Sequence, residues 1–287
     1  MAIKKLIIRG IILLILSINA YPSLSQLPSC SENSEGAITY TGGGSCVLTA
    51  DTYTITFYFI GLCQTQPTVQ NFRTACSPLF QSNEGKTIAL TKDTQVDLID
   101  EVSVKEGIYP YAAILMSKTQ YFSISKKFSP ARTGKTGTGE WCWTLEGNSV
   151  DWNFSSIDKN TWVADCGPTP PTTVGQSFYS PNAFHNSGTG FQPTFSGSTV
   201  ETSYSAHILL SDETLTSGNS GNYFSFPEAT YALGLQTFNT PVTISPNTSN
   251  INVGFLMTNA HDVLASAGGN VLRFTPEYWA FKVLSTN

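Results

Sequence analysis

Residues 52–60 read TYTITFYFI, and this stretch decides the fold class of the chain. Large apolar side chains stand at every second position, with Thr or Tyr between them; the apolar positions are Tyr53, Ile55, Phe57 and Phe59. Successive side chains of an extended strand point to opposite faces, so a period of two places the apolar set on one face. The segment therefore predicts a half-buried β-strand.

Similar short runs recur along the chain and are separated by Gly, Pro, Asn and Asp. They predict further strands at residues 87–90, 95–99, 108–117, 120–125, 141–145, 205–210, 229–236, 242–245, 252–257, 270–274 and 279–284. Charged residues are only 12% of the chain, and its abundance of Thr, Ser and aromatic residues suits strands better than helices. This rhythm predicts an all-β fold, an antiparallel β-sandwich. The one helix expected is a turn or two at residues 259–266.

Two stretches interrupt the pattern. Residues 126–140 (KKFSPARTGKTGTGE) are cationic and rich in Gly and Thr, which predicts an exposed hairpin loop or a junction between two lobes. Residues 167–198 are rich in Pro, Thr, Ser and Gly, which predicts long loops. We expect one β region over residues 26–287 with a first lobe that ends near residue 135. Two separate sandwiches are the alternative.

Residues 1–25 have the pattern of a secretory signal peptide. Lys4, Lys5 and Arg9 precede an apolar run at residues 11–18, and small residues follow, so cleavage is expected after Ala20 or Ser25. The run is shorter than the ~20 residues of a membrane span, so we expect no transmembrane segment after cleavage.

The mature protein is then extracellular, periplasmic or on the cell surface. A type IV prepilin site after Gly10 is the alternative, although Ile15 stands where that family has Glu.

All six cysteines lie beyond residue 25. An even number in an exported chain predicts three disulfides. We expect the pairing that is most local in sequence: Cys30–Cys46, Cys63–Cys76 and Cys142–Cys166. A zinc site is the alternative, but the chain has no CxxC pair and no His near one.

Loss of residues 1–25 removes three cations and leaves 12 Lys and Arg against 20 Asp and Glu, a net charge of about −8. An acidic protein is a poor ligand for nucleic acid or anionic lipid, so neither is an expected partner. No motif predicts a cofactor or a metal ion.

Three motifs resemble known sites but fit local structure better. Residues 129–136 (SPARTGKT) approach the phosphate-binding P-loop, yet the residues GTGE that follow cannot begin a helix. Residues 218–221 (GNSG) resemble the nucleophile turn of a serine protease, yet no His and Asp occupy the required upstream places. The acidic residues of positions 93–101 lack the spacing of a calcium loop. We expect turns and a solvated strand face at these places.

The three histidines, His185, His207 and His261, show no metal-binding or catalytic spacing. His207 lies in a predicted strand and is expected to be a structural residue with satisfied hydrogen bonds. The chain is therefore predicted not to be an enzyme, and an extracellular hydrolase with a site built from distant carboxylates is the less supported alternative.

Four of the five tryptophans cluster around Cys142: Trp141, Trp143, Trp152 and Trp162. Trp141 and Trp143 share one face of a predicted strand, while Cys142 points to the other. Large aromatic side chains beside a disulfide are typical of a sandwich core. The alternative is a sugar-stacking surface that uses Trp143, Trp152 and Trp162.

A resemblance supports the sandwich. The runs KTIAL, QVDL, EGIY and AAIL between residues 86 and 115 resemble the strand–Gly-x-Tyr–strand segment of uncharacterised bacterial extracellular β-sandwich domains of transthyretin-like topology. Residues 52–63 and the Cys142-Trp143-Thr144 segment are similar to a family of secreted proteins of unknown function from marine bacteria. The resemblance covers about half the chain and implies a fold, but no catalytic residue.

These observations predict an exported, non-catalytic structural protein, such as a filament subunit or an adhesin-like component. Its expected partners are further copies, through edge strands, or surface glycans. The C-terminal strand at residues 279–284 either completes its own sheet or supplies an edge to a neighbour. A carbohydrate-binding module is the alternative from another class.

Overall fold

The structure is a computed structural model that describes residues 29–39, 44–91, 104–149, 158–181, 184–186, 190–192, 194–198, 202–216, 228–248, 250–255, 261–265, 270–276 and 281–286. Within these residues strands are the main element, helix is almost absent, and the strands pair antiparallel. The predicted all-β, disulfide-stapled fold is confirmed.

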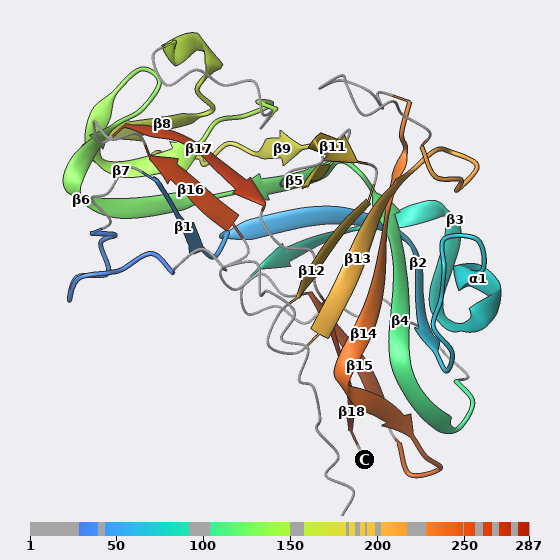
Figure 1. Ribbon diagram of the computed structural model, residues 1–287. Helices are drawn as coiled ribbons and strands as arrows, with labels where there is room; N and C mark the ends of the chain where they lie inside the picture. Colours follow the sequence, from blue (N-terminus) through green and yellow to red (C-terminus); the bar gives the residue numbers. More distant parts are fainter. Residues whose placement is uncertain are drawn as a thin grey trace, which may run out of the picture.

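The largest sheet joins strands from both halves of the chain (Figure 1). Its order is β12 (Thr194–Ser198), β13 (Thr202–Leu209), β14 (Tyr231–Ile244), β4 (Gly107–Ser117), β2 (Thr52–Cys63), β5 (Gln120–Ser123) and β9 (Ser177–Tyr179), and β3 (Cys76–Thr91) also pairs with β2. The first part of β2 buries every second residue, as the alternation predicts. Beyond Tyr58 every residue of β2 is buried, because both faces of the sheet are covered there.

Two three-stranded sheets lie together at one end, at the left of Figure 1. One is β1 (Gly44–Leu48), β16 (His261–Ala265) and β17 (Val271–Pro276), and the other is β6 (Ser125–Thr133), β7 (Thr138–Thr144) and β8 (Ala164–Gly167). Cys142 on β7 and Val263 on β16 belong to one core cluster that continues along β2 into the large sheet.

At the other end, a second core cluster lies under the short helix α1 (Phe72–Ala75). The remaining described elements are two ribbons, β10 (Phe184–Asn186) with β11 (Gly190–Gln192) and β15 (Asn250–Phe255) with β18 (Phe281–Thr286), and the 3-10 helix η1 (Lys159–Thr161).

The predicted boundary at residues 126–140 is a β-hairpin. β6 and β7 fill most of it, and the turn between them is residues 134–137. Strands on either side of this hairpin in the sequence pair with each other, since β4 pairs with β14. The stretch therefore does not separate one sheet from another.

The prediction of a helix at residues 259–266 is wrong. The structure has strand β16 there, hydrogen-bonded on one side to β1 and on the other to β17. Short strands also occupy parts of residues 167–198, where long loops were expected. The C-terminal strand β18 pairs with β15 of the same chain, over Asn250↔Thr286 to Phe255↔Phe281. The predicted strand at residues 95–99 lies outside the described residues.

All three predicted disulfides are present: Cys30–Cys46, Cys63–Cys76 and Cys142–Cys166. The last two join residues that are directly opposed in paired strands. No cysteine is free. Three disulfides are consistent with an oxidising, non-cytoplasmic compartment.

In the part of the chain that the structure describes, no helix is long and apolar enough to cross a membrane. The predicted signal peptide, residues 1–25, lies outside the described residues.

Candidate functional site

Two tryptophans of β7 point away from the core. Cys142, between them in the sequence, is fully buried, whereas Trp141 and Trp143 are only half-buried. Neither residue is a member of either core cluster. We call the outer side of β6, β7 and β8 around these two residues the tryptophan face.

The strand register defines the neighbours of this face. Trp141 lies between Lys127 of β6 and Gly167 of β8. A Cβ atom on Gly167 would stand 3.0 Å from Cη2 of Trp143, so the edge of this indole lies close over the glycine. Glycine gives the ring room that any larger residue would fill.

Lys127 is the central residue of a charged cluster beside Trp141. Its Nζ is 3.2 Å from Oε2 of Glu35 and 3.7 Å from Oε2 of Glu140. The hydrogen bond with Glu35 is the main reason why the pKa of Lys127 is raised. The carboxylates are well exposed, at 71% and 55% of their side-chain surface.

Trp162, another predicted stacking residue, does not join this face. Trp162 is only 1% exposed, with Nζ of Lys159 5.6 Å from its ring centre, so it packs inside and offers no stacking face. Trp152 lies outside the described residues. Of the predicted set of Trp143, Trp152 and Trp162, the structure removes Trp162 and leaves Trp143, which lies on this face with Trp141; the prediction for Trp152 is not tested.

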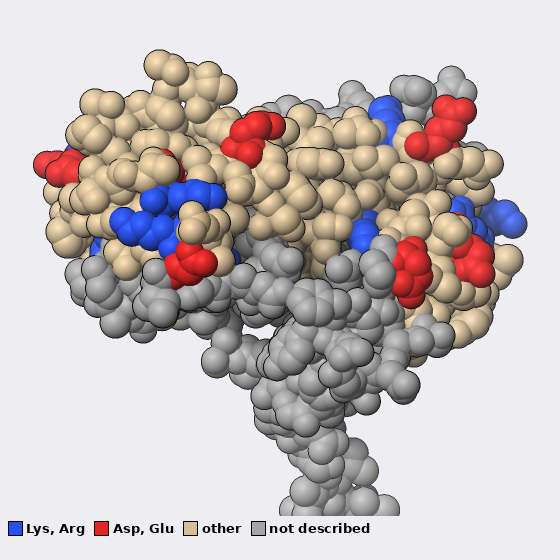
Figure 2. All heavy atoms as spheres, turned by 90° about the horizontal axis from the view of Figure 1, so that it is seen from above, with Lys and Arg blue, Asp and Glu red and all other residues tan. Residues whose placement is uncertain are grey.

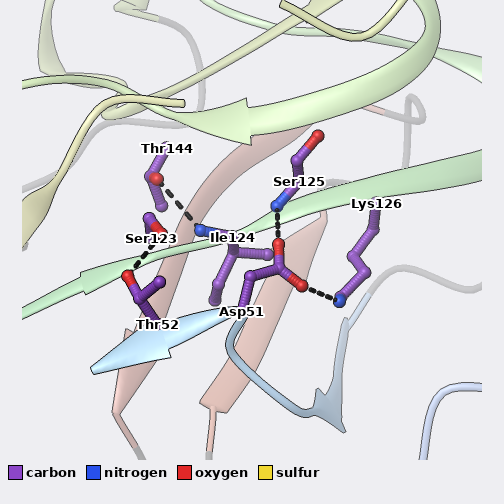
Figure 3. A network of polar contacts seen from close by, with 7 residues as sticks. All are labelled: Asp51, Thr52, Ser123, Ile124, Ser125, Lys126 and Thr144. Carbon is purple, nitrogen blue, oxygen red and sulfur yellow. Dashed lines mark hydrogen bonds and ion pairs between the residues drawn. The ribbon is translucent and has the colours of Figure 1, made fainter. Parts of the chain in front are cut away.

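A polar junction fixes the start of β6 (Figure 3). Oδ2 of Asp51 accepts a hydrogen bond from the backbone N–H of Ser125 at 2.6 Å, and Oδ1 pairs with Nζ of Lys126 at 2.5 Å. The hydroxyls of Thr52 and Ser123 meet at 2.6 Å. Because Lys126 is held toward Asp51, the next residue along the strand, Lys127, lies on the tryptophan face.

A cavity of about 370 Å³ opens beside this ion pair. Its described lining is mixed: Cys30, Glu32, Ile38, Val47, Leu48, Thr49, Ala50, Asp51, Thr91 and Lys126. The volume is within the range of small-molecule sites. Of its three ionised lining groups, Asp51 and Lys126 are already paired with each other, and Glu32 is the third.

The P-loop-like segment binds a carboxylate of the protein itself. The backbone N–H groups of Thr136 and Gly137 each donate to Oδ1 of Asp165 at 2.9 Å, and the Thr136 hydroxyl donates to Oδ2. Burial raises the pKa of Asp165, but these bonds and one from the Cys166 N–H outweigh it and lower the pKa overall. No local sequence signal identifies Asp165 as the partner of this turn, because it lies on another strand.

His207 has the structural role that was predicted. Its Nδ1 lies 3.0 Å from the Thr194 hydroxyl, and its Nε2 lies 2.8 Å from the Ser205 hydroxyl. Burial lowers the pKa of His207 to about 4, so the ring is neutral at pH 7. In a catalytic triad a carboxylate accepts a hydrogen bond from Nδ1 of the histidine. Here a hydroxyl lies in that place.

The other histidines belong to strands, His185 to β10 and His261 to β16. The GNSG segment and the acidic residues of positions 93–101 lie outside the described residues. Within the described ranges, no group of three His, Cys, Asp or Glu side chains could hold a metal ion.

Comparisons with protein families, with curated proteins and with solved structures found no match for this chain. Its function is therefore inferred from its own geometry.

Proposed function

We propose that this protein is an exported, non-catalytic component of the cell surface or extracellular space, of the structural or adhesin-like kind. The observation that carries the proposal is the use of all six cysteines in three disulfides. Such bonds persist in oxidising compartments and stabilise a protein that must survive outside the cell.

The polar groups most suited to catalysis support a structural role. The carboxylate of Asp165 closes a turn, the ring of His207 bonds to two hydroxyls, and Asp51 pairs with Lys126. Each is engaged by the chain itself, which leaves none of them positioned as an acid, base or nucleophile.

The surface fits contacts with uncharged partners. Seen from above, the described surface is mainly neutral, with one basic patch and an acidic group beside it at the left and scattered charged groups elsewhere (Figure 2). Only 12% of the residues are charged. Such a surface favours hydrogen bonding and apolar contact over the electrostatic binding of polyanions.

Cell fractionation tests the export proposal. The full chain is expressed in a bacterial host, and intact cells are treated with protease before the protein is probed with a thiol-reactive polymer. We expect the mature chain outside the cytoplasm, without free thiols. A chain without residues 1–25 is the matched control and should stay inside with reactive cysteines. A full-length protein found in the cytoplasm with reactive cysteines contradicts the proposal.

Negative-stain microscopy and size-exclusion chromatography of the mature protein test the structural part. Filaments or stable oligomers support a subunit role, and attachment of the monomer to the cell surface supports an adhesin-like role. A strictly monomeric protein that never localises to the surface contradicts both.

A further inference from the structure

We propose that the tryptophan face binds a neutral pyranose of an extracellular glycan, with Trp141 and Trp143 as stacking residues. The assignment rests on the proposed function, because such a glycan is met outside the cytoplasm. The proposed site is more specific than a general adhesive surface, because it consists of two indole rings and one charged cluster and takes one class of ligand.

The rings have the chemistry that a pyranose requires. The π face of an indole is electron-rich, and it attracts the weakly positive C–H groups on one side of a sugar ring. Trp141 and Trp143 are two residues apart on one strand, which separates them by roughly 7 Å on the same side of the sheet. Since both are only half-buried, part of each residue is exposed and available to a ligand.

The face is held rigid from behind and at both edges. The Cys142–Cys166 disulfide joins β7 and β8 on the buried side. Backbone bonds between Ile38 and β6 cover one edge, with the Ile38 N–H 2.8 Å from the Lys127 carbonyl. The turn held by Asp165 covers β8, with the Lys135 N–H 3.0 Å from the Ala164 carbonyl. A backbone that is already rigid leaves less conformational entropy to be lost when the face binds.

The charged cluster supplies polar contacts and selects against anions. Carboxylates of Glu35 and Glu140 accept hydrogen bonds from sugar hydroxyls, and Nζ of Lys127 donates to ring or hydroxyl oxygens. Within this cluster two carboxylates face one ammonium, so the cluster itself carries a net negative charge. A uronic acid or sulfated sugar is therefore repelled, while a neutral hexose is not.

Titration of the mature protein tests the assignment. The neutral probes are hexasaccharides of cellulose, mannan, xylan and galactan, and the anionic probe is hexagalacturonate. Tryptophan fluorescence and calorimetry report binding. We expect at least one neutral probe to bind and to shift the fluorescence, and hexagalacturonate to bind at least tenfold more weakly.

Variants locate the binding. W141A and W143A should each weaken the neutral probe about tenfold, which is the effect of losing about 1.4 kcal/mol of stacking. W143F keeps an aromatic face and should retain more affinity than W143A. Y121A is the matched control, because Tyr121 is 43% exposed on β5 beside Phe178 and is not part of this face. Near-UV circular dichroism confirms that each variant is folded.

The outcomes are distinct from those of the export test. No binding of any neutral probe, equal affinity in W141A, W143A and the wild type, or preference for hexagalacturonate overturns the tryptophan face as a glycan site. A change of oligomeric state in W141A and W143A without loss of a glycan ligand assigns the face to a second copy of the chain and also overturns it. None of these results alters the cellular location that the fractionation measures.

Discussion

At each of two ends of the molecule, a disulfide and a charged side chain hold a surface segment in place. The two charged side chains differ in their burial and in the groups that bind them. At the end with β6, β7 and β8, Cys142–Cys166 lies beside Asp165, which is 8% exposed and bound by backbone N–H groups. At the end with α1, Cys63–Cys76 closes a loop whose Arg73 forms an ion pair with Glu213.

The difference lies in solvent access. The Arg73 and Glu213 side chains keep 29% and 27% of their surface exposed, so water and salt weaken their attraction. Arg73 also lies 5.4 Å from the ring centres of Phe59 and Phe72, which adds contacts that salt does not screen. The first end depends on one buried anion, while the second spreads its stability over several weaker contacts.

Removal of the disulfides is expected to have the largest effect. In the chain-entropy model, replacing Cys142 and Cys166 by Ala costs about 3.5 kcal/mol, and replacing Cys63 and Cys76 costs about 3 kcal/mol because the loop is shorter. Urea unfolding of the two double variants measures both values. If the variant without Cys63–Cys76 lost more stability than the variant without Cys142–Cys166, by more than about 1 kcal/mol, the expected order of the two ends would be reversed.

Loss of the buried anion is expected next. Asp165→Ala leaves the N–H groups of Thr136, Gly137 and Cys166 without their acceptor and should cost about 3 kcal/mol in urea unfolding. Asp165→Asn keeps the shape and one carbonyl acceptor, so it should cost less. Equal stability of D165A and the wild type would show that the turn does not need the carboxylate.

Acid should separate the contribution of Asp165 from that of His207, which lies on β13 of the large sheet. The folded-state pKa of His207 is lowered by burial to about 4, so stability is full above pH 6.5 and falls by about 3 kcal/mol as pH drops toward 4. The pKa of Asp165 is also lowered, so its contribution is lost only below its ordinary value, as pH falls through the folded-state pKa.

Unfolding of the wild type, H207Q and D165N from pH 8 to pH 2 measures these contributions. H207Q should remove the loss of stability between about pH 6.5 and pH 4. D165N should remove the loss that occurs at lower pH. An unchanged slope in H207Q would show that the ring is not the group titrating in the upper range.

The smallest effect is expected at the exposed ion pair. Arg73→Ala should cost about 1 kcal/mol, and Arg73→Met less, because its side chain preserves contact with the two rings. The difference between wild type and R73M should shrink at 1 M salt, whereas the effect of D165A should not. If the stability lost in R73M were the same at low and high salt, the ion pair would not be screened.

Local patterns predicted much of the fold. The alternation in β2 and the proximity of the cysteine pairs in sequence are local properties, and both predictions are confirmed. The predicted strands at residues 229–236 and 242–245 are one strand, β14, because the chain passes Pro241 at a shift of register against β4. A break in pairing accommodates a proline that an unbroken ladder would exclude.

The remaining features depend on partners distant in sequence. Residues 261–265 form a strand because β1 and β17 supply hydrogen bonds on both sides, which no local propensity reveals. The same holds for the site. A period of two places Trp141 and Trp143 on one face, but the charged cluster beside them needs Glu35, which is far from Lys127 in sequence.

For the proposed export, the strand order has a consequence for the time course of folding. Every cysteine precedes residue 167, whereas β14, β16 and β17 come from the last part of the chain and complete sheets begun by β4 and β1. A chain that emerges from its N-terminus can therefore form its local disulfides while these sheets are still open. Pairings of long sequence separation form slowly. We expect the oxidised, unfinished chain to be the form that needs protection from aggregation, and pulse-labelling on non-reducing gels would detect it.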